Sequence, residues 1–391
     1  MNQVMKDAVI VAYGRSAVSR AGKGALRNTN PIDLAAQVLK GVLAKVPQLP
    51  LEEVEDIVVG CAKPECNQRY NIARLIAVRA GLPYSTSGQT VNRFCASGLQ
   101  SVSIAANMIM TGQSEVIVAG GVESMTAVPY MGIGDPEFRN KWIDENEPGL
   151  YMGMGLTAEL VAEKYNITRQ EMEEFAVKSQ QKAAKAQSEG ILGMDIIPVD
   201  AVDDDGVTVT VFDKDECIRA SATVEGLSGL KPAFKEDGRV TAGTSSPTND
   251  GAAMVVLMSL EKAKELGIEP IAKFAAFAVA GVDPAYMGIG PIAAVPKVMR
   301  LTGLNVEDMD VIELNEAFAA QSIPCIKELG LDPDKVNING GAIALGHPLG
   351  ATGAILTGKA LTQLKRGGGR YALVSMCIGG GMGAAAILER M

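Results

Sequence analysis

The sequence predicts an α/β protein with more than one domain. Its 391 residues exceed the length at which one hydrophobic core normally stops growing, so two or three domains or subdomains are expected. Hydrophobic residues make up 47% of the chain and aromatic residues only 4%, which is typical of α/β layers packed from small aliphatic side chains. Strand-like apolar runs alternate with stretches of helical periodicity near both ends of the chain.

The first third of the chain supplies six of these elements. Residues 8–12 form an uninterrupted apolar run that is typical of a buried strand. Two more strands are expected over residues 56–61 and 115–119. Between them, helical periodicity predicts three helices, over residues 31–45, 71–80 and 98–110.

The last third repeats this rhythm. Strands are expected over residues 311–314, 336–338 and 371–374, and helices over residues 316–329 and 353–364. Two segments match most closely, because a small-residue turn, an apolar helix and a strand follow one another in both. The offset is 255 residues between Gly98 and Gly353 and 256 residues between Val118 and Val374. We interpret this constant offset as an internal duplication whose two units meet at equivalent helix N-termini.

The middle of the chain, from about residue 121 to 250, has a different texture. It contains Met-rich, Pro-bearing and charged stretches with amphipathic helices in place of strand–helix alternation. Thr168 and Glu171 form a capping box that predicts the start of one helix. We therefore predict an inserted loop domain over residues 121–250, an N-terminal half over residues 1–120 and 251–270, and a C-terminal half over residues 271–391.

Charge and composition exclude several classes of function. The net charge of −9 argues against a general nucleic-acid binder, because phosphate recognition needs a concentrated basic surface. No apolar stretch approaches the roughly 18 residues of a membrane span. The six cysteines are too sparse for a disulfide scaffold. Cys61 and Cys66 lack a second ligand pair, and the acidic residues 203–205 are better explained as a solvated turn, so no metal is expected.

Cys95 stands directly before an expected helix. A thiol at a helix N-terminus feels the helix dipole and unpaired N–H groups, and both stabilise the thiolate. Cys95 is therefore a candidate nucleophile, with a small buried apolar cysteine as the alternative.

His347 is the only histidine in the chain and lies between Gly346 and Pro348. An imidazole titrates near neutral pH and can take a proton from a thiol. Cys377 is followed closely by three glycines at residues 379–381. These glycine-rich turns indicate a tightly built pocket, while a satisfied core histidine is the alternative reading of His347.

Asn315 follows the strand expected over residues 311–314. Its amide can orient a water or donate to an oxyanion, and the alternative is a helix N-cap. Glu316 stands at the expected helix start, where a favourable interaction with the helix dipole is a sufficient reason for it.

Taken in this order, the motifs around Cys95, Asn315, His347 and Cys377 resemble those of the thiolase family. The resemblance covers nearly the whole chain. The segments that carry it are residues 8–15, 91–98, 241–253, 315–318, 346–348 and 377–381. It implies the thiolase fold, in which two duplicated α/β halves pack as five layers (αβαβα) with an inserted loop domain.

The resemblance also implies a reaction, the thiolytic cleavage of a 3-ketoacyl-CoA by CoA, reversible as a Claisen condensation. Cys95 would attack the ketone carbonyl, His347 would activate this thiol, and Cys377 would exchange a proton with the acetyl-CoA carbanion or with incoming CoA. Asn315 would position a water that, with His347, stabilises the enolate oxygen. The N–H groups of Cys95 and Gly380 would form a second oxyanion pocket.

CoA is a substrate in such an enzyme, and no separate cofactor is expected. By the same resemblance, Arg219 would lie near the nucleotide end of CoA. Three residues would line the pantetheine, namely Phe234, Ala242 and Ser246. Three more would lie near the acyl end, namely Met154, Met287 and Phe318.

Within the family, the chain departs from the biosynthetic acetoacetyl-CoA pattern because Gly153 stands where that branch usually has histidine. We therefore favour a degradative 3-ketoacyl-CoA thiolase, an acetyl-CoA C-acyltransferase. The alternatives are an acetoacetyl-CoA thiolase and a non-catalytic CoA-binding scaffold with the same fold. A ketoacyl synthase fits poorly, because the chain has one histidine and a second candidate cysteine.

The resemblance implies a homodimer or homotetramer. A cytoplasmic setting is expected because the first residues lack a small-residue cleavage site and the sparse cysteines fit a reducing compartment. Other β-oxidation enzymes are candidate partners. Because two reactive thiols would face one cavity, we also expect that an oxidant can join Cys95 to Cys377 and silence the enzyme.

Overall fold

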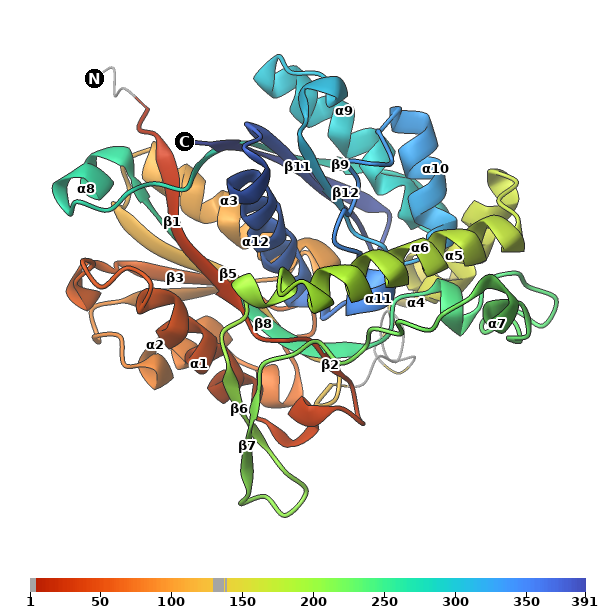
Figure 1. Ribbon diagram of the computed structural model, residues 1–391, viewed down its shortest axis with the longest axis horizontal. Helices are drawn as coiled ribbons and strands as arrows, with labels where there is room; N and C mark the ends of the chain where they lie inside the picture. Colours follow the sequence, from red (N-terminus) through yellow and green to blue (C-terminus); the bar gives the residue numbers. More distant parts are fainter. Residues whose placement is uncertain (1–4, 129–136, 138) are drawn as a thin grey trace.

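The computed structural model describes residues 5–128, 137 and 139–391 (Figure 1). Five strands of the first half lie side by side in the order β1, β8, β5, β3 and β4, and the two-residue strand β2 pairs with β8. The bounds of these strands are β1 (Ala8–Arg15), β2 (Ser19–Arg20), β3 (Asp56–Gly60), β4 (Ser87–Val91), β5 (Val116–Ser124) and β8 (Asn249–Ser259).

Four strands of the second half continue the same sheet in the order β9, β12, β11 and β10. The two halves are joined where β1 pairs with β9, through Val9 opposite Lys273 and Ile10 opposite Ala272. The bounds of these strands are β9 (Ala272–Gly281), β10 (Val311–Leu314), β11 (Tyr371–Ile378) and β12 (Met382–Arg390).

The two halves have the same strand topology, which confirms the predicted duplication. In the first half β3 and β5 are parallel, β5 is antiparallel to β8, and β8 is antiparallel to β1. In the second half β10 and β11 are parallel, β11 is antiparallel to β12, and β12 is antiparallel to β9. Each strand of one set therefore has its counterpart at the same place in the other.

Helices cover both outer faces and fill the space between the halves, as the predicted five-layer αβαβα arrangement requires (Figure 1). Helices α1 and α2 pack on one face of the first half, α9 and α10 pack on the outer face of the second, and α3 and α12 lie between the two. Side chains of β1 alternate accordingly: Val9 and Val11 join the α1–α2 layer, while Ala8 and Ile10 join the central layer. The bounds of these helices are α1 (Pro31–Leu43), α2 (Ile72–Ala80), α3 (Ser97–Met110), α9 (Gly290–Thr302), α10 (Ala319–Leu329) and α12 (Leu349–Gly367).

The central helices α3 and α12 approach each other closely at the two glycines that revealed the duplication. A Cβ atom on Gly98 would lie 2.7 Å from the carbonyl oxygen of Gly350, and one on Gly353 would collide with the backbone nitrogen of Leu99. Glycine at both positions lets the backbones touch near the N-terminus of each helix.

Three local predictions were wrong. Residues 336–338 are not a strand, since only Val336 makes an isolated bridge, to Ile312. The helix expected from Glu316 begins at Ala319, so Glu316 lies outside it. It accepts hydrogen bonds from Ser179 Oγ (2.6 Å) and Asn337 Nδ2 (2.8 Å), so a buried network rather than a helix dipole accounts for it.

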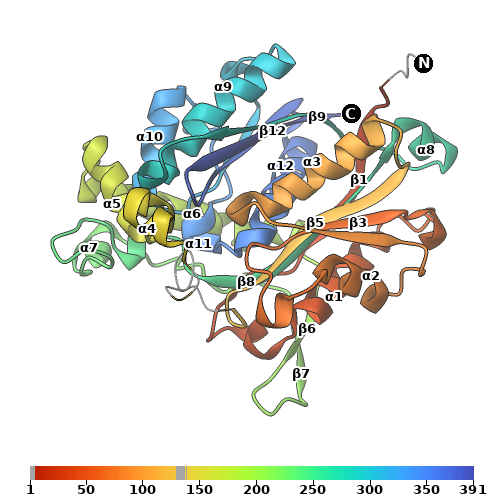
Figure 2. The same cartoon turned by 180° about the vertical axis from the view of Figure 1, so that it is seen from behind.

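The segment between β5 and β8 contains helices, as predicted, and also a two-stranded hairpin that the sequence analysis missed. This hairpin stands apart from the layers in both views (Figures 1 and 2). The capping box of Thr168 and Glu171 is confirmed at the start of α6. Residues 129–136 and 138 of the predicted insertion lie outside the described residues, and the domain boundaries remain a prediction. The elements are α4 (Lys141–Asn146), α5 (Met154–Lys164), α6 (Arg169–Ser188), β6 (Val199–Val202), β7 (Val209–Phe212) and α7 (Val224–Ser228); outside the segment lie α8 (Leu260–Glu265) and α11 (Ala342–Leu345).

A buried arginine ties this segment to the first strand. Arg15, at the end of β1, donates from Nε to Asp195 (3.0 Å) and from Nη1 to Asp215 (2.7 Å), and all three side chains are buried. The backbone of Arg15 also bonds to Asp195 and Ile197. The inserted segment is thus fixed against the sheet by a fully paired charge.

Candidate active site

A cavity of about 170 Å³ lies at the N-terminal ends of the two central helices. Cys95 precedes α3 and His347 precedes α12, and both line this cavity. The duplication therefore brings together a thiol from one half and an imidazole from the other.

The backbone around Cys95 is held in a strained turn. Phe94 has a φ of +44°, a conformation rare for a residue with a side chain. The Phe94 N–H donates to Asn92 Oδ1 (2.8 Å), and its carbonyl oxygen accepts from Ser97 Oγ (2.6 Å). These bonds fix the position of the Cys95 sulfur at the cavity wall.

Burial raises the pKa of the Cys95 thiol to about 11, against the opposing effect of two backbone N–H groups. One of them belongs to Cys95 itself and the other to Gly379. Gly379 also lines the cavity. The oxyanion role expected of the neighbouring Gly380 N–H remains a prediction.

His347 is buried and held by three contacts. Its backbone N–H donates to Asn249 Oδ1 (2.9 Å), its Nδ1 lies 2.6 Å from Thr352 Oγ1, and its Nε2 lies 3.4 Å from Asn315 Nδ2. Burial lowers the pKa of His347 to about 4, so the ring is neutral near neutral pH. A neutral imidazole keeps one nitrogen with a free lone pair, as a base requires.

Glycine is required just before His347. Gly346 has a φ of +105°, and a Cβ atom there would collide with the Asn249 side chain that holds the His347 backbone. The glycine-rich stretch seen in the sequence thus serves to seat the imidazole.

Asn315 is buried at the end of β10, and its side-chain Oδ1 has no hydrogen-bond partner among the described residues. Its backbone N–H donates to the Ser375 carbonyl (2.9 Å), which fixes it beside β11. A buried acceptor without a partner is costly, so Oδ1 is suited to hold a water or a substrate group.

Cys377 lies near the end of β11 and is fully buried among apolar side chains that include Met287 and Phe318. Burial, and next to it the nearby Cys95 sulfur, raises the pKa of the Cys377 thiol well above its usual value. Cys377 is therefore a protonated thiol close to Cys95. All six cysteines are free thiols in the structure, and the oxidative disulfide remains a prediction.

The residues expected to contact CoA divide between two neighbouring cavities. Ser245 and Pro247 line both cavities, so the two adjoin. A cavity of about 120 Å³ contains Arg219 and Ala242. The cavity with Cys95 contains the other five, namely Met154, Phe234, Ser246, Met287 and Phe318.

The comparisons with known proteins decide the family. Residues 8–261 match the family described as "Thiolase, N-terminal domain", and residues 268–390 match "Thiolase, C-terminal domain". The chain belongs to the thiolase family.

Individual relatives of this thiolase-family chain align over nearly its whole length. A "3-ketoacyl-CoA thiolase" of Bacillus subtilis (strain 168) is 48% identical, covering 98% of this chain and 100% of the relative. The "3-ketoacyl-CoA thiolase" of Vibrio vulnificus (strain CMCP6) is 45% identical, covering 99% of this chain and 100% of the relative. The solved acetyl-CoA acetyltransferase of Bacillus anthracis superposes with a TM-score of 0.92 at 41% identity, covering 99% of this chain and 100% of that one.

Three residues of this thiolase site escaped the sequence analysis. Gly379 was overlooked because neighbouring glycines in a run look alike in sequence. Thr352 lies five residues after His347 and contacts its ring. Asn249 lies at the C-terminal end of the inserted segment and accepts a hydrogen bond from the His347 backbone. Two signals were available, the spacing of Thr352 on the helix that starts after His347 and the place of Asn249 in the family-like segment 241–253. Neither indicated a contact with His347.

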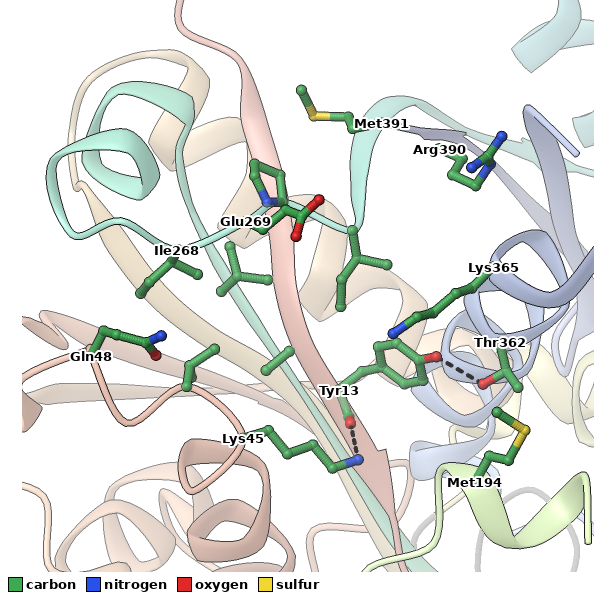
Figure 3. Close-up of a pocket in the computed structure, with 15 residues that line it drawn as sticks. Tyr13, Lys45, Gln48, Met194, Ile268, Glu269, Thr362, Lys365, Arg390 and Met391 are labelled. Atoms are coloured by element: carbon green, nitrogen blue, oxygen red, sulfur yellow. Dashed lines mark hydrogen bonds between the residues drawn. The ribbon is translucent and has the colours of Figure 1, made fainter. Parts of the chain in front are cut away.

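A larger cavity of about 640 Å³ contains none of the predicted catalytic or CoA-binding residues (Figure 3). It lies at the other end of α12, where the Tyr13 hydroxyl is 2.8 Å from Thr362 Oγ1 and Lys45 Nζ donates to the Tyr13 carbonyl oxygen (2.8 Å). The candidate active site is therefore chosen by the convergence of Cys95, His347 and Gly379 and not by the size of the cavity.

Within residues 5–128, 137 and 139–391, no three His, Cys, Asp or Glu side chains gather closely enough to hold a metal ion. None of the helices in this part of the chain combines the length and the hydropathy needed to cross a membrane.

Proposed function

We propose that this protein is a 3-ketoacyl-CoA thiolase, an acyltransferase that cleaves 3-ketoacyl-CoA with CoA to acetyl-CoA and a shortened acyl-CoA. One observation carries the proposal. A thiol, the sole imidazole of the chain and a backbone N–H donor line a single cavity, each supplied by a different turn.

The reaction begins from a neutral pair. With the pKa of Cys95 raised to about 11 and that of His347 lowered to about 4, neither side chain is charged near neutral pH. The Cys95 proton moves to His347 as the sulfur attacks the ketone carbon of the substrate. The oxyanion that forms accepts hydrogen bonds from the N–H groups of Gly379 and Cys95.

Collapse of this intermediate breaks the carbon–carbon bond. The acyl group stays on Cys95 as a thioester, and the acetyl-CoA enolate takes a proton from the Cys377 thiol. A water on the unpartnered Oδ1 of Asn315, together with the protonated ring of His347, stabilises the enolate oxygen.

The second half-reaction restores the enzyme. The Cys377 thiolate takes the thiol proton of incoming CoA, and the CoA sulfur attacks the acyl carbon. The Cys95 sulfur leaves and recovers its proton from His347. Both cysteine side chains of the cycle are then protonated as at the start, because the proton that Cys377 gave to acetyl-CoA has been replaced by one from CoA.

The similar proteins carry two different names. The sequence relatives are called 3-ketoacyl-CoA thiolases, and the solved structure is called an acetyl-CoA acetyltransferase. We propose that the substrate of this chain is the longer 3-ketoacyl-CoA. Four apolar side chains line the reactive cavity and support an acyl chain longer than acetyl, namely Met125, Met154, Met287 and Phe318. Gly153 precedes Met154 in the chain, and nothing lies within 4 Å of a Cβ built there, so no neighbour excludes a larger residue at this position.

Thiolysis rates for C4 and for C8 or longer 3-ketoacyl-CoAs test this proposal. We expect kcat/KM to be higher for the longer substrates, and Cys95→Ala protein serves as the blank for each chain length. Activity confined to C4 would identify an acetoacetyl-CoA thiolase instead. A wild-type protein without activity at any length would identify a CoA-binding scaffold.

The proposal extends to cofactors, oligomeric state and cellular location. CoA serves as substrate and no other cofactor is needed, because thiols and an imidazole supply every proton and nucleophile of the cycle. Among the described strands β4 pairs with β3 alone, and such an edge supports a homodimer or homotetramer. We place the enzyme in the cytoplasm, working with other enzymes of β-oxidation.

A further inference from the structure

The hydroxyl of Thr352 contacts the His347 ring nitrogen that faces away from Asn315. Thr352 lies in the first turn of α12 and is buried. Its Oγ1 is 2.6 Å from His347 Nδ1 and 3.0 Å from the carbonyl oxygen of Pro348. Both distances are those of hydrogen bonds.

A count of hydrogens assigns the direction of these bonds. A threonine hydroxyl has one hydrogen, and the Pro348 carbonyl can only accept, so Thr352 donates to Pro348 and accepts from Nδ1. The opposite arrangement would place a hydrogen on Nε2, where it would face the N–H₂ group of Asn315 at 3.4 Å. Two donors would then meet, whereas a lone pair on Nε2 accepts from Asn315.

We propose that Thr352 is a positioning residue that holds His347 in the Nδ1–H tautomer, so that the lone pair of Nε2 is the base of the reaction. Thr352 acts through His347 and touches no substrate. This role rests on the proposed function only in assigning His347 as the base; the tautomer itself is a property of the resting protein.

The partner of Nδ1 is a neutral hydroxyl, not a carboxylate. Two cations line the small cavity beside Thr352, namely Arg15 and Lys359, and each is paired with acids, Arg15 with Asp195 and Asp215 and Lys359 with Glu313. Thr352 can therefore orient the ring without the added charge that a carboxylate partner would use to favour the imidazolium.

The sole histidine makes the tautomer directly observable. Protein labelled with ¹⁵N-histidine gives one imidazole, and the ¹⁵N shifts of its two ring nitrogens show which one carries hydrogen. We expect wild-type protein at neutral pH to have a protonated Nδ1 and an unprotonated Nε2. A protonated Nε2 in the wild type would overturn the proposal whatever the variants do.

Two substitutions test the hydroxyl. Thr352→Val has nearly the same shape but cannot accept from Nδ1, whereas Thr352→Ser keeps the hydroxyl. We expect the valine variant to show a mixed or reversed tautomer and a single-turnover acylation rate of Cys95 lower by about 10- to 100-fold, since a wrong tautomer alone can cost up to about 10⁴-fold. We expect the serine variant to keep the wild-type shifts and a rate within about threefold.

The two proposals fail in different ways. Wild-type tautomer shifts in a folded valine variant would overturn the role of Thr352 and leave the thiolase reaction untouched. Absence of acyl transfer in the wild type, with the expected tautomer present, would overturn the reaction and leave the role of Thr352 in setting the ring intact.

Discussion

The N-termini of the two central helices are related by the duplication, yet the residues that meet them from the other half differ. Position 123 in β5 and position 379 after β11 differ by 256, the same offset as Val118 and Val374. Each reaches across to the helix of the other half: Glu123 accepts from the Gly350 N–H of α12 (2.8 Å), and the Gly379 N–H points to Cys95 before α3.

The two helix N-termini differ in the group that accepts their N–H hydrogen bonds. A helix N-terminus is a ready anion site. At α12 the protein fills this site with its own carboxylate, because Glu123 also accepts from the Ala62 N–H (2.8 Å) and Gln68 Nε2 (2.9 Å). At α3 the equivalent residue is Gly379, whose N–H faces the Cys95 sulfur in the reactive cavity. One copy of the feature is therefore occupied by the protein's own carboxylate, and the other carries the oxyanion site that we propose.

The largest expected effect is on the thiolysis rate, which should depend on the Cys95 thiol near α3 and not on the Cys61 thiol near Glu123. Cys95→Ala removes the acyl carrier at α3 and should lower thiolysis by about 10⁴-fold or more. Cys61→Ala removes a buried thiol beside Glu123, on the structural side, and the folded variant should keep its rate within about threefold. Steady-state thiolysis and the mass of acylated protein measure both. An acyl adduct on Cys95→Ala protein would break the comparison.

Next in size is the stability contributed by Glu123. Replacing it with alanine leaves the Ala62 and Gly350 N–H groups without their acceptor in the interior, and should lower the free energy of unfolding by about 3 kcal/mol. Glu123→Gln keeps the volume but turns one acceptor into a donor, and should cost about half as much. Urea unfolding measures both, with the exposed Glu174→Gln as a control near zero. If Glu123→Ala were as stable as the control, the carboxylate would not be structural.

The smallest expected effect concerns the contact between the helices themselves. Gly353→Ala and Gly98→Ala push α3 and α12 apart and should each cost about 1–3 kcal/mol, with Gly353→Ala the worse because its Cβ lies nearer to backbone. Gly367→Ala, at the far end of α12, meets nothing within 4 Å and should be neutral or slightly stabilising. Thermal unfolding compares the three. Equal melting temperatures for all would show that the helices do not depend on this close approach.

Much of this arrangement could be predicted from the sequence, because it depends on local periodicity. Alternating apolar runs gave the strands and helices, and a constant offset gave the duplication. Wrong predictions arose where tertiary contacts decide: Glu316 serves a buried network rather than a helix start, and residues 336–338 have only a bridge. The Gly379 N–H that bonds the Cys95 sulfur could not be predicted, because a run of glycines carries no mark of which amide points inward.

The site residues divide in the same way. Cys95, His347, Asn315 and Cys377 stand in recognisable motifs, and the structure places them around one region. Thr352 could not be identified as the partner of His347, because its role appears only when the first turn of α12 folds back over the ring.

The buried ion pairs of Arg15 affect how the protein unfolds. Peeling the loop segment away from the sheet would leave a guanidinium stranded inside the end of β1 without Asp195 or Asp215. This segment also forms one wall of the cavity that contains Cys95 and His347, and it should therefore unfold together with the sheet rather than open on its own. Limited proteolysis under native conditions would then find few productive cuts around these acids until the whole fold is lost.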